Sequence, residues 1–487
     1  MSKKYLYGAS VQGIQQFIFQ TNELQDIVGA SELVDSICKE MFKEFAHGGE
    51  FIQKAAGNIR FLFEDQNTCR KAVKEFPKKV LNTAPGISIT QAVVCIEDGS
   101  DFRIVKEELE KRLHFQRNCP MRSMTIGLMG MERSRKTGLP VVKEEKGEML
   151  DAPTVAKRAK TNTRKLCEKS FGAEEIKDHA VAYNIEGMTS KNDWIAIIHA
   201  DGNGLGKVVE KVSKDGEDKL KEFSSNLDKA TEKAAQETYK TILSLPEYEA
   251  RTQKIPFRPV VLGGDDMTII CRADLAVPYT KAFLVNFEKY TSEYIGSKLT
   301  ACAGIAFIKS SYPFYYGYDL AETLCTQAKN TAKKIKEDLA PSCLMFHKVQ
   351  SSFVEDYAEI KEKELTPNRD YKTSYAFGPY FLEDQSGYWT VKELQDNVRK
   401  LEGDLGNKAK GHIRQWMTLM NENYDKAQQK EERVKSVGDK YVKEIFEKAT
   451  KQNEKGEITY YAAYDLLALH SVTYQEIKNN EEKGEER

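Results

Sequence analysis

Three aspartates carry the chemistry that this sequence predicts. Asp265 and Asp266 end a Gly-Gly-Asp-Asp tetrapeptide between two apolar, β-rich runs, and Asp201 directly follows the apolar run 194–200. Divalent cations are held by carboxylate oxygens, and two such ions can clamp a triphosphate together with an attacking hydroxyl. We therefore predict that the three aspartates are catalytic residues and ligands of two Mg²⁺ or Mn²⁺ ions.

The order of the predicted elements explains how distant aspartates can meet. Apolar periodicity predicts a β-α-β-β-α-β order over about 192–350, followed by another helix and a short strand. The elements are expected at 194–200, 220–242, the hairpin around 263–266, 276–294, 299–308, 318–336 and 343–346. In such a sheet, ordered 4-1-3-2, the end of strand 1 lies beside the hairpin that joins strands 2 and 3. Asp201 and the Asp265–Asp266 pair fall at those two places, so we expect them to share one edge of the sheet.

Glycines next to the aspartates are predicted to contact a nucleotide. Gly263 and Gly264 have no Cβ, so a substrate or metal can approach their backbone closely. Gly202, Asn203 and Gly204 form a loop before a helical region, and free N–H groups in such a loop can bind phosphates.

Two lysines and two serines are further candidates for nucleotide binding. Lys329 and Lys333 lie four residues apart on a predicted helix and are expected to neutralise a triphosphate, although a solvated helix face explains them equally well. Ser31 and Ser224 lie on predicted helices and could contact a base or sugar, with close helix packing as the alternative.

Several other site types are excluded. The loop after Asp201 is not a Walker A motif, because Asp201 occupies its first glycine position and Val208 replaces Ser or Thr. The sequence contains neither Gly-x-Ser-x-Gly nor a His-Asp dipeptide, and the order Asp178-His179 is reversed. A lone strand histidine such as His199 is usually a core residue.

Four domains are expected. The β-α-β-β-α-β order also occurs near the N-terminus, which predicts a divergent internal duplication. There, Ala56-Gly57-Asn58 replaces the acidic turn. The predicted domains are a degenerate first unit at 1–100, a connector at 101–190, a catalytic second unit at 191–350, and a helical C-terminal domain at 351–487 with a disordered tail.

The composition is that of a globular cytoplasmic protein. The 487 residues carry a formal charge of −1, so the chain as a whole is no polycationic nucleic-acid binder. Nine scattered cysteines without a Cys-x-x-Cys pair indicate a reducing compartment. We expect no membrane association, because no apolar run is long enough to span a bilayer. The basic run 157–165 suggests RNA contact, with a solvated surface as the alternative.

Four stretches carry a resemblance to a known family. They are VQGIQQFI at 11–18 with VGASELV at 28–34, HADGNGLG at 199–206, GGDD at 263–266, and AKNTAK at 328–333. In these stretches the chain resembles the large polymerase/cyclase subunit of type III CRISPR effector complexes, of the Cmr type.

This resemblance implies an α+β protein with two ferredoxin-like palm domains that face each other. It also implies that ATP is joined by 3′–5′ linkages into cyclic oligoadenylates that alert antiviral effectors. Asp201 and Asp265 would be metal ligands, and Asp266 a ligand or support. The first palm would bind no metal but could bind the acceptor nucleotide. The chain departs from the family in lacking an N-terminal His-Asp nuclease domain and the zinc-binding cysteines of the connector.

The sequence thus predicts a metal-dependent nucleotidyltransferase that acts on ATP and releases pyrophosphate. Partners would be guide or target RNA and other effector-complex subunits if the protein works in such a complex; a stand-alone defence enzyme and a homo-oligomer are equally compatible. One alternative is a catalytically silent scaffold that binds RNA and partner proteins. Another is an enzyme similar to diguanylate cyclases, which would use GTP.

Overall fold

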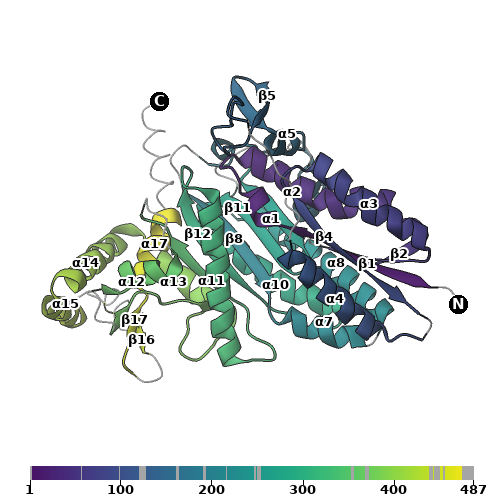
Figure 1. The fold of residues 1–487 in the computed structure, drawn as a ribbon. Coiled ribbons are helices and arrows are strands. Elements are labelled where there is room, and N and C mark those ends of the chain that lie inside the picture. Colours follow the sequence, from purple (N-terminus) through teal and green to yellow (C-terminus); the bar gives the residue numbers. More distant parts are fainter. Residues whose placement is uncertain are drawn as a thin grey trace.

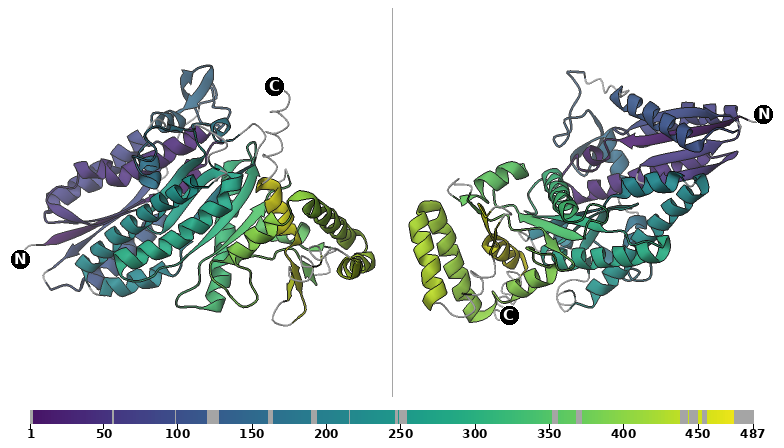
Figure 2. Two further views of the ribbon diagram at one scale, coloured as in Figure 1. Left: turned by 180° about the vertical axis from the view of Figure 1, so that it is seen from behind. Right: turned by 90° about the horizontal axis from the view of Figure 1, so that it is seen from below.

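Two β-α-β-β-α-β units lie face to face in the computed structural model, and the C-terminal elements extend from the second unit (Figures 1 and 2). The structure describes residues 3–55, 57–97, 99–119, 128–160, 164–189, 194–214, 216–245, 248, 254–351, 356–367, 372–437, 443, 450–452 and 456–473. The predicted disordered tail lies outside these residues. Among the described residues, no helix is both long enough and apolar enough to cross a membrane.

The first unit is an antiparallel sheet in the order β2-β3-β1-β4. Its elements are β1 Lys4–Gln12, α1 Ile14–Ile18, α2 Leu24–Lys39, the 3-10 helix η1 Met41–Glu44, β2 Gly49–Ala55, β3 Asn58–Phe63, α3 Gln66–Thr83 and β4 Ser88–Ile96. Strand β1 is buried on both faces: Tyr7 belongs to the core shared with α2 and α3, whereas Leu6 belongs to a second cluster with Leu109 of α4 Phe102–Asn118. Successive strand residues point to opposite faces, so this burial requires helices on both sides.

The second unit has the sheet order β10-β11-β8-β12-β13-β15. Its elements are β8 Trp194–Gly202, α7 Leu205–Lys214, α8 Glu217–Leu243, β9 Lys254–Ile255, β10 Phe257–Gly263, β11 Asp266–Arg272, η3 Ala273–Leu275, α10 Ala276–Ile295, β12 Ala301–Lys309, α11 Phe314–Ile335 and β13 Cys343–Lys348. Strand β8 is antiparallel to β11, with Ala200 opposite Met267. The predicted strand order and the predicted neighbourhood of strands 1 and 3 are confirmed.

The connector and the C-terminal part contain more strand than the sequence indicates. The connector comprises α4, β5 Val141–Glu145, β6 Glu148–Asp151, α5 Ala152–Arg158, α6 Lys165–Phe171, β7 Ala180–Val181 and η2 Ile185–Gly187. The C-terminal part comprises α12 Tyr357–Lys363, β14 Thr373–Ser374, β15 Tyr380–Phe381, α13 Val391–Arg399, α14 Gly403–Glu422, α15 Tyr424–Val437, β16 Thr450–Gln452, β17 Thr459–Tyr461 and α17 Ala463–Thr473. It is mostly helical, as predicted, but β14, β17 and β16 form a small sheet, and β15 joins the sheet of the second unit. These strands are only two or three residues long, too short to produce a recognisable alternation.

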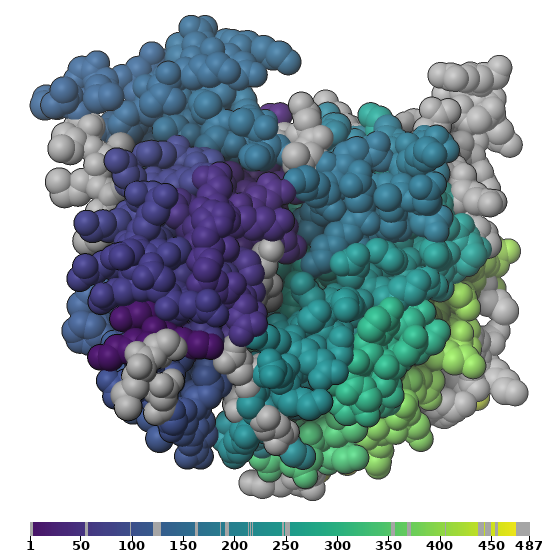
Figure 3. All heavy atoms as spheres, turned by 90° about the vertical axis from the view of Figure 1, so that its right-hand side faces the viewer, coloured from purple at the N-terminus to yellow at the C-terminus, as the bar shows by residue number. Residues whose placement is uncertain are grey.

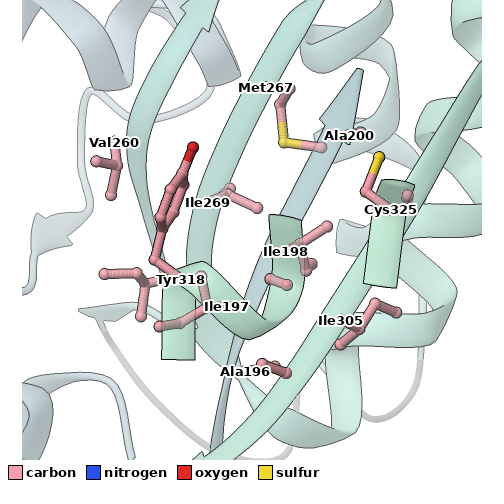
Figure 4. Close-up of a cluster of buried hydrophobic side chains, with 14 of the residues drawn as sticks. Ala196, Ile197, Ile198, Ala200, Val260, Met267, Ile269, Ile305, Tyr318 and Cys325 are labelled. Atoms are coloured by element: carbon pink, nitrogen blue, oxygen red, sulfur yellow. The ribbon is translucent and has the colours of Figure 1, made fainter. Parts of the chain in front are cut away.

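The core of the second unit lies around β8. Ile197, Ile198, Ile269 and Ile305 are almost completely buried between the sheet and its helices (Figure 4). Helix α11 packs very closely on β12, because a Cβ at Gly304 would lie 1.9 Å from the Ala321 carbonyl oxygen. Glycine at this position lets the backbone of α11 rest on the strand, which fixes the helix relative to the sheet edge.

The two units contact each other through helices of the first and the sheet and α11 of the second. Viewed from the side, the residues of the first unit (purple and blue) meet those of the second (teal) along a seam (Figure 3). Phe19 stacks on Tyr318 with ring centroids 4.7 Å apart, and Gln15 Nε2 donates a hydrogen bond of 2.9 Å to the Tyr318 hydroxyl. Ser31 Oγ donates a hydrogen bond to the Val260 carbonyl oxygen. The seam therefore joins the first unit to the strand and helix that flank the Gly-Gly-Asp-Asp hairpin.

Candidate functional site

The three predicted aspartates lie together at one edge of the second sheet. Asp201 is near the end of β8, Asp266 begins β11, and Asp265 is in the turn between β10 and β11. All three line one cavity of about 390 Å³, which we call the aspartate cavity. The carboxyl groups of Asp265 and Asp201 lie close enough for the charge of Asp201 to raise the pKa of Asp265. Residues far apart in the chain therefore converge as the strand order requires.

Burial and mutual repulsion disfavour the ionised forms of two of these carboxyls. Burial, followed by the charge of Asp201, raises the pKa of Asp265 to about 7. The same two causes raise the pKa of Asp266 to about 7, and Glu322 adds to the effect. Asp266 Oδ1 is buried and accepts no hydrogen bond. Binding of a cation would therefore lower the free energy of the site.

Lys329 supplies a positive charge to this cluster. Its Nζ donates hydrogen bonds to Asp201 Oδ2 and, at 2.8 Å, to the Gly202 carbonyl oxygen. The Lys329 side chain is only 14% exposed, which lowers the dielectric around the pair. The ammonium group thus lies between two oxygens of the kind that bind divalent cations.

His199 borders the cluster but carries no charge there. Its Nδ1 lies 3.1 Å from Thr268 Oγ1 and 3.5 Å from Asp266 Oδ1. Burial lowers the pKa of His199, which favours the neutral ring. The sequence-based reading of His199 as a buried core residue agrees with its position, although the residue also lines the aspartate cavity.

The donor set fits a hard divalent cation. It consists of carboxylate oxygens, one of them buried without a hydrogen bond, and a lysine ammonium group that stands in for a cation. Within the described ranges, no group of three or more His, Cys, Asp or Glu side chains is arranged as a ready-made metal site. Asp201 and Asp265 would therefore hold a metal after Lys329 has moved away from Asp201.

Glycines permit the close packing of this edge. A Cβ at Gly202 would lie 2.7 Å from Asp265 Oδ2, so a side chain there would displace the carboxyl. Gly264 has φ +62°, a conformation that other residues adopt with strain. Gly263 and Gly204 line cavities, and no atom lies within 4 Å of a Cβ placed at Gly204.

The turn of the hairpin is held by side chains that the sequence analysis did not identify. Asp228 Oδ1 on α8 accepts a hydrogen bond of 2.9 Å from the Gly264 N–H, and Thr231 Oγ1 donates one of 2.5 Å to the Gly264 carbonyl oxygen. Lys169 Nζ on α6 donates to the Leu262 carbonyl oxygen at 2.8 Å and lies 3.9 Å from Asp228 Oδ1. We call Asp228, Thr231 and Lys169 the hairpin clamp. Its members contact backbone groups of the turn, and spacing in the sequence gives no signal of such contacts.

A second cavity adjoins the first. It has a volume of about 700 Å³, lies along the seam between the two units, and is called the seam cavity below. Its walls include Ser31 of the first unit and Leu262 of the second, and it shares Gln15, Gly263, Asp266 and Tyr318 with the aspartate cavity. The site therefore has two chambers that meet at the hairpin.

The predicted serines and lysines lie in different places. Ser224 lines the aspartate cavity and Ser31 the seam cavity, where its hydroxyl is bonded to Val260, so the structure shows the packing contact for Ser31. Lys333 does not join Lys329 at the aspartates; it is exposed and lines a separate groove with Gly204. The two lysines therefore face different chambers.

Asn203 has a structural contact that the sequence analysis did not predict. Its Nδ2 donates to Thr300 Oγ1 at 3.1 Å and to the Ala340 carbonyl oxygen at 3.2 Å. These bonds turn the amide toward the body of the unit and fix the loop after Asp201.

The first unit has no acid at its corresponding turn. Asn58 accepts a hydrogen bond of 2.8 Å from Ser10 Oγ and lines the aspartate cavity. Ala56 lies outside the described residues. The first unit thus contributes neutral side chains to the aspartate cavity.

The interpretation of the basic run 157–165 as an RNA contact is wrong for its first two residues. Lys157 is fully buried and donates to Gln20 Oε1 at 3.0 Å, while Arg158 pairs with Asp26 and Glu148, both at 2.8 Å. These side chains join the connector to the first unit. Residues 161–163 lie outside the described part of the chain.

Glu322 is a further site residue that the sequence analysis missed. It lines the aspartate cavity with Tyr318, and both lie on α11 with Lys329. Spacings of four and seven residues put these three side chains on one helix face, so helical periodicity from Lys329 could have identified them.

A family model matches the part of the chain that contains the three aspartates. Residues 194–339 match the family model of the second palm domain of Cas10/Cmr2. No curated protein matches the chain. The resemblance to type III CRISPR palm-domain subunits is confirmed by this match and by the structural similarities below.

Solved structures share the fold over most of the chain. A chain of the Csm1–Csm4 cassette in complex with cA4 superposes with a TM-score of 0.58 at 13% identity, covering 97% of this chain and 69% of that chain. The cassette in complex with AMPPNP gives 0.57 at 14% identity, with the same coverage. The Csm1–Csm4 subcomplex of the type III-A CRISPR-Csm interference complex gives 0.56 at 14%, again with this coverage. The α+β fold with paired palm units is therefore established.

We expect the metal-free protein to lose stability as the pH rises from 6 to 8. Asp266 has a pKa of about 7 in the folded protein, against about 4 in an unfolded chain, so the folded state binds this proton more tightly. Its contribution is complete below pH 4 and is lost as the pH rises through 7. Because the Asp266 side chain is 37% exposed, solvent screening makes this loss smaller than the full pKa shift would give. Urea unfolding in EDTA at the two pH values measures the loss.

Asp266→Asn should have a smaller pH slope than the wild type, and the exposed Asp384→Asn should keep the full slope. The buried Asp465, whose pKa is also about 7, contributes equally in all three proteins. Equal slopes for Asp266→Asn and the wild type would contradict the electrostatic description of the site.

Removing one contact of the hairpin clamp should weaken metal binding. Thr231→Val deletes the hydrogen bond to the Gly264 carbonyl oxygen, and we expect a stability loss of about 1 kcal/mol and a roughly tenfold lower Mn²⁺ affinity. Calorimetric titration with Mn²⁺ measures the affinity. Thr241→Val is the matched control, because its hydroxyl bonds to the Glu237 carbonyl oxygen on an exposed turn of the same helix. Equal Mn²⁺ affinities for the two variants would show that the clamp does not position the hairpin.

Proposed function

Since residues 194–339 form a second palm domain of the Cas10/Cmr2 family, we propose that this protein is a metal-dependent nucleotidyltransferase. It joins ATP molecules by 3′–5′ linkages into a cyclic oligoadenylate and releases pyrophosphate. Its cofactors are two Mg²⁺ or Mn²⁺ ions, and the product is a second messenger in antiviral defence.

The observation that carries this proposal is the pair of chambers that meet at the hairpin. Condensation of two nucleotides needs a donor and an acceptor on either side of the reacting phosphorus. The aspartate cavity and the seam cavity share Gly263 and Asp266, and each contains one predicted serine. Their positions support a donor beside Asp201 and Asp265 and an acceptor against the first unit.

The charged residues of the chain prepare the reaction. Asp201 and Asp265 would hold the metal ions, and Asp266 would be a third ligand or a support for them. When bound, the ions neutralise the triphosphate and lower the pKa of the acceptor 3′-hydroxyl. Lys329, released from Asp201, remains beside the triphosphate and offsets the negative charge of the departing pyrophosphate.

The covalent change needs no enzyme-bound intermediate. The acceptor 3′-oxygen forms a bond to the donor α-phosphorus, and the bond from that phosphorus to the bridging oxygen of pyrophosphate breaks in line. The hydroxyl proton passes to solvent. Tyr318 and Gln15 are hydrogen-bonded to each other where the chambers meet. They hold the two nucleotides in fixed positions relative to each other.

Effector-complex subunits are the proposed protein partners. The likeness to chains of the Csm1–Csm4 cassette supports this assignment, and guide or target RNA would then reach the protein within the complex.

The alternative function, a catalytically silent scaffold, is disfavoured because crowded carboxylates repel one another unless a cation is present. In a protein that binds no metal, the repulsion between Asp201, Asp265 and Asp266 would destabilise the fold with no function to offset it.

Incubation with ATP, GTP or both in Mn²⁺ tests the proposal. We expect pyrophosphate and a cyclic adenylate product from ATP, none after EDTA, and a loss of at least about 100-fold in Asp265→Ala/Asp266→Ala. Glu383→Ala/Asp384→Ala, which removes an exposed acidic pair at Glu383 and Asp384, should retain full activity. A cyclic product from GTP alone would favour the diguanylate cyclase alternative, and RNA binding without ATP consumption would favour the scaffold.

A further inference from the structure

A second groove continues outward from the aspartate cavity. It has a volume of about 940 Å³ and runs between α4 and α7, which lie side by side (Figure 1). Lys106 of α4 and Val209 of α7 line both this groove and the aspartate cavity. The two hollows are therefore continuous, and we call the outer one the α4–α7 groove.

Helix α4 does not need cations on this side for its packing. Val105, Leu109 and Leu113 form its buried stripe against the sheet of the first unit. The residues beside this stripe are free to be polar or charged of any type. The cations of α4 that line the groove are therefore not required by the packing of the helix.

The groove carries an excess of positive charge. It is lined by Arg103, Lys106, Lys111, Arg117 and Lys214. Three glutamates also line it, at positions 107, 110 and 210, and two of them have partners.

Neighbouring cations neutralise two of these glutamates. Glu110 Oε1 accepts hydrogen bonds of 3.1 and 2.7 Å from Arg60, whose side chain is almost buried. Glu210 lies 3.5 Å from Lys214. Among the described residues, Lys106 and Lys111 form no ion pair, so the groove presents uncompensated positive charge next to the candidate catalytic centre.

An exposed aromatic ring lies among these cations. Phe115 lines the groove and is 68% exposed. Cations that follow a backbone, together with an aromatic ring on which a base can stack, are the features that bind single-stranded nucleic acids. From Lys106 to Arg117 the helix extends about 16 Å, which is longer than a triphosphate and suits a short oligonucleotide.

We propose that the α4–α7 groove binds the 5′-triphosphate end of the linear oligonucleotide while its 3′-hydroxyl lies at the hairpin, where the aspartate cavity and the seam cavity meet. This inference rests on the proposed function and adds a binding site to it. Each added nucleotide moves the highly charged 5′ end away from the aspartates, which repel it. The cations of α4 hold that end and keep the unfinished chain on the protein until it closes.

The test compares two charge-reversal variants. Lys111→Glu/Arg117→Glu changes two exposed side chains that line the groove but not the aspartate cavity. Arg117 Nη2 also donates a hydrogen bond of 3.4 Å to Ser10 Oγ. Lys71→Glu/Lys78→Glu makes the same charge change at exposed positions of α3, away from the groove. Fluorescence anisotropy in Mg²⁺ measures the affinity for three probes: ATP, a linear triadenylate with a 5′-triphosphate and a 3′-deoxy end, and the same triadenylate with a 5′-hydroxyl. The 3′-deoxy end prevents extension, so this binding test does not depend on turnover.

We expect Lys111→Glu/Arg117→Glu to bind the 5′-triphosphate triadenylate about tenfold more weakly, with little change for ATP or for the 5′-hydroxyl probe. In reactions with ATP, this variant should release more short linear products, whereas Lys71→Glu/Lys78→Glu should behave like the wild type. Equal weakening for both triadenylates would identify a general single-strand site and overturn the assignment to the triphosphate end. Unchanged affinity for all three probes would also overturn it. A protein that binds the probes as expected but makes no product from ATP would instead contradict the proposed function.

Discussion

The crowding of carboxylates at one sheet edge is the constraint on which the rest of the site depends. Asp265 and Asp266 are half-buried beside Asp201, and their pKa values of about 7 reflect the free energy that full ionisation would cost. Full ionisation of these carboxyls at neutral pH therefore needs a positive charge nearby. In the structure this charge comes from Lys329, which bonds Asp201 and the neighbouring carbonyl. The Lys329 ammonium group thus stabilises the crowded carboxylates in the protein without metal or nucleotide.

The fold brings this edge together from parts with different roles. The antiparallel pairing of β8 and β11 places Asp201 next to the hairpin, and the hairpin clamp fixes the turn from α8 and α6. Helix α6 belongs to the connector, which is also anchored to the first unit: the Leu166 N–H donates to Glu32 Oε1 at 2.9 Å. The geometry of the hairpin is thus coupled to both units, and a change in the connector can reach the aspartates through Lys169.

Strand order and the three acids could be predicted from the sequence because both depend on local pattern and simple topology. Apolar runs define the strands, and the β-α-β-β-α-β order brings Asp201 to the hairpin. Contacts between side chains and backbone carry no such pattern, so Asp228 and Thr231 were missed. The basic run also led to a wrong prediction. Lys157 was expected on the surface, but its side chain is buried against Gln20 and the ring of Phe17. Lys333 follows the spacing of Lys329 yet lies about one turn further along α11, where it lines another groove.

A crystal structure with Mn²⁺ and a non-hydrolysable ATP analogue would locate the metal by its anomalous scattering and show where Lys329 lies when nucleotide is bound. We expect manganese between the carboxylates of Asp201 and Asp265, with the Lys329 ammonium group moved from Asp201 to the phosphates of the analogue. Manganese bound elsewhere, or an intact Lys329–Asp201 ion pair with nucleotide present, would contradict this expectation.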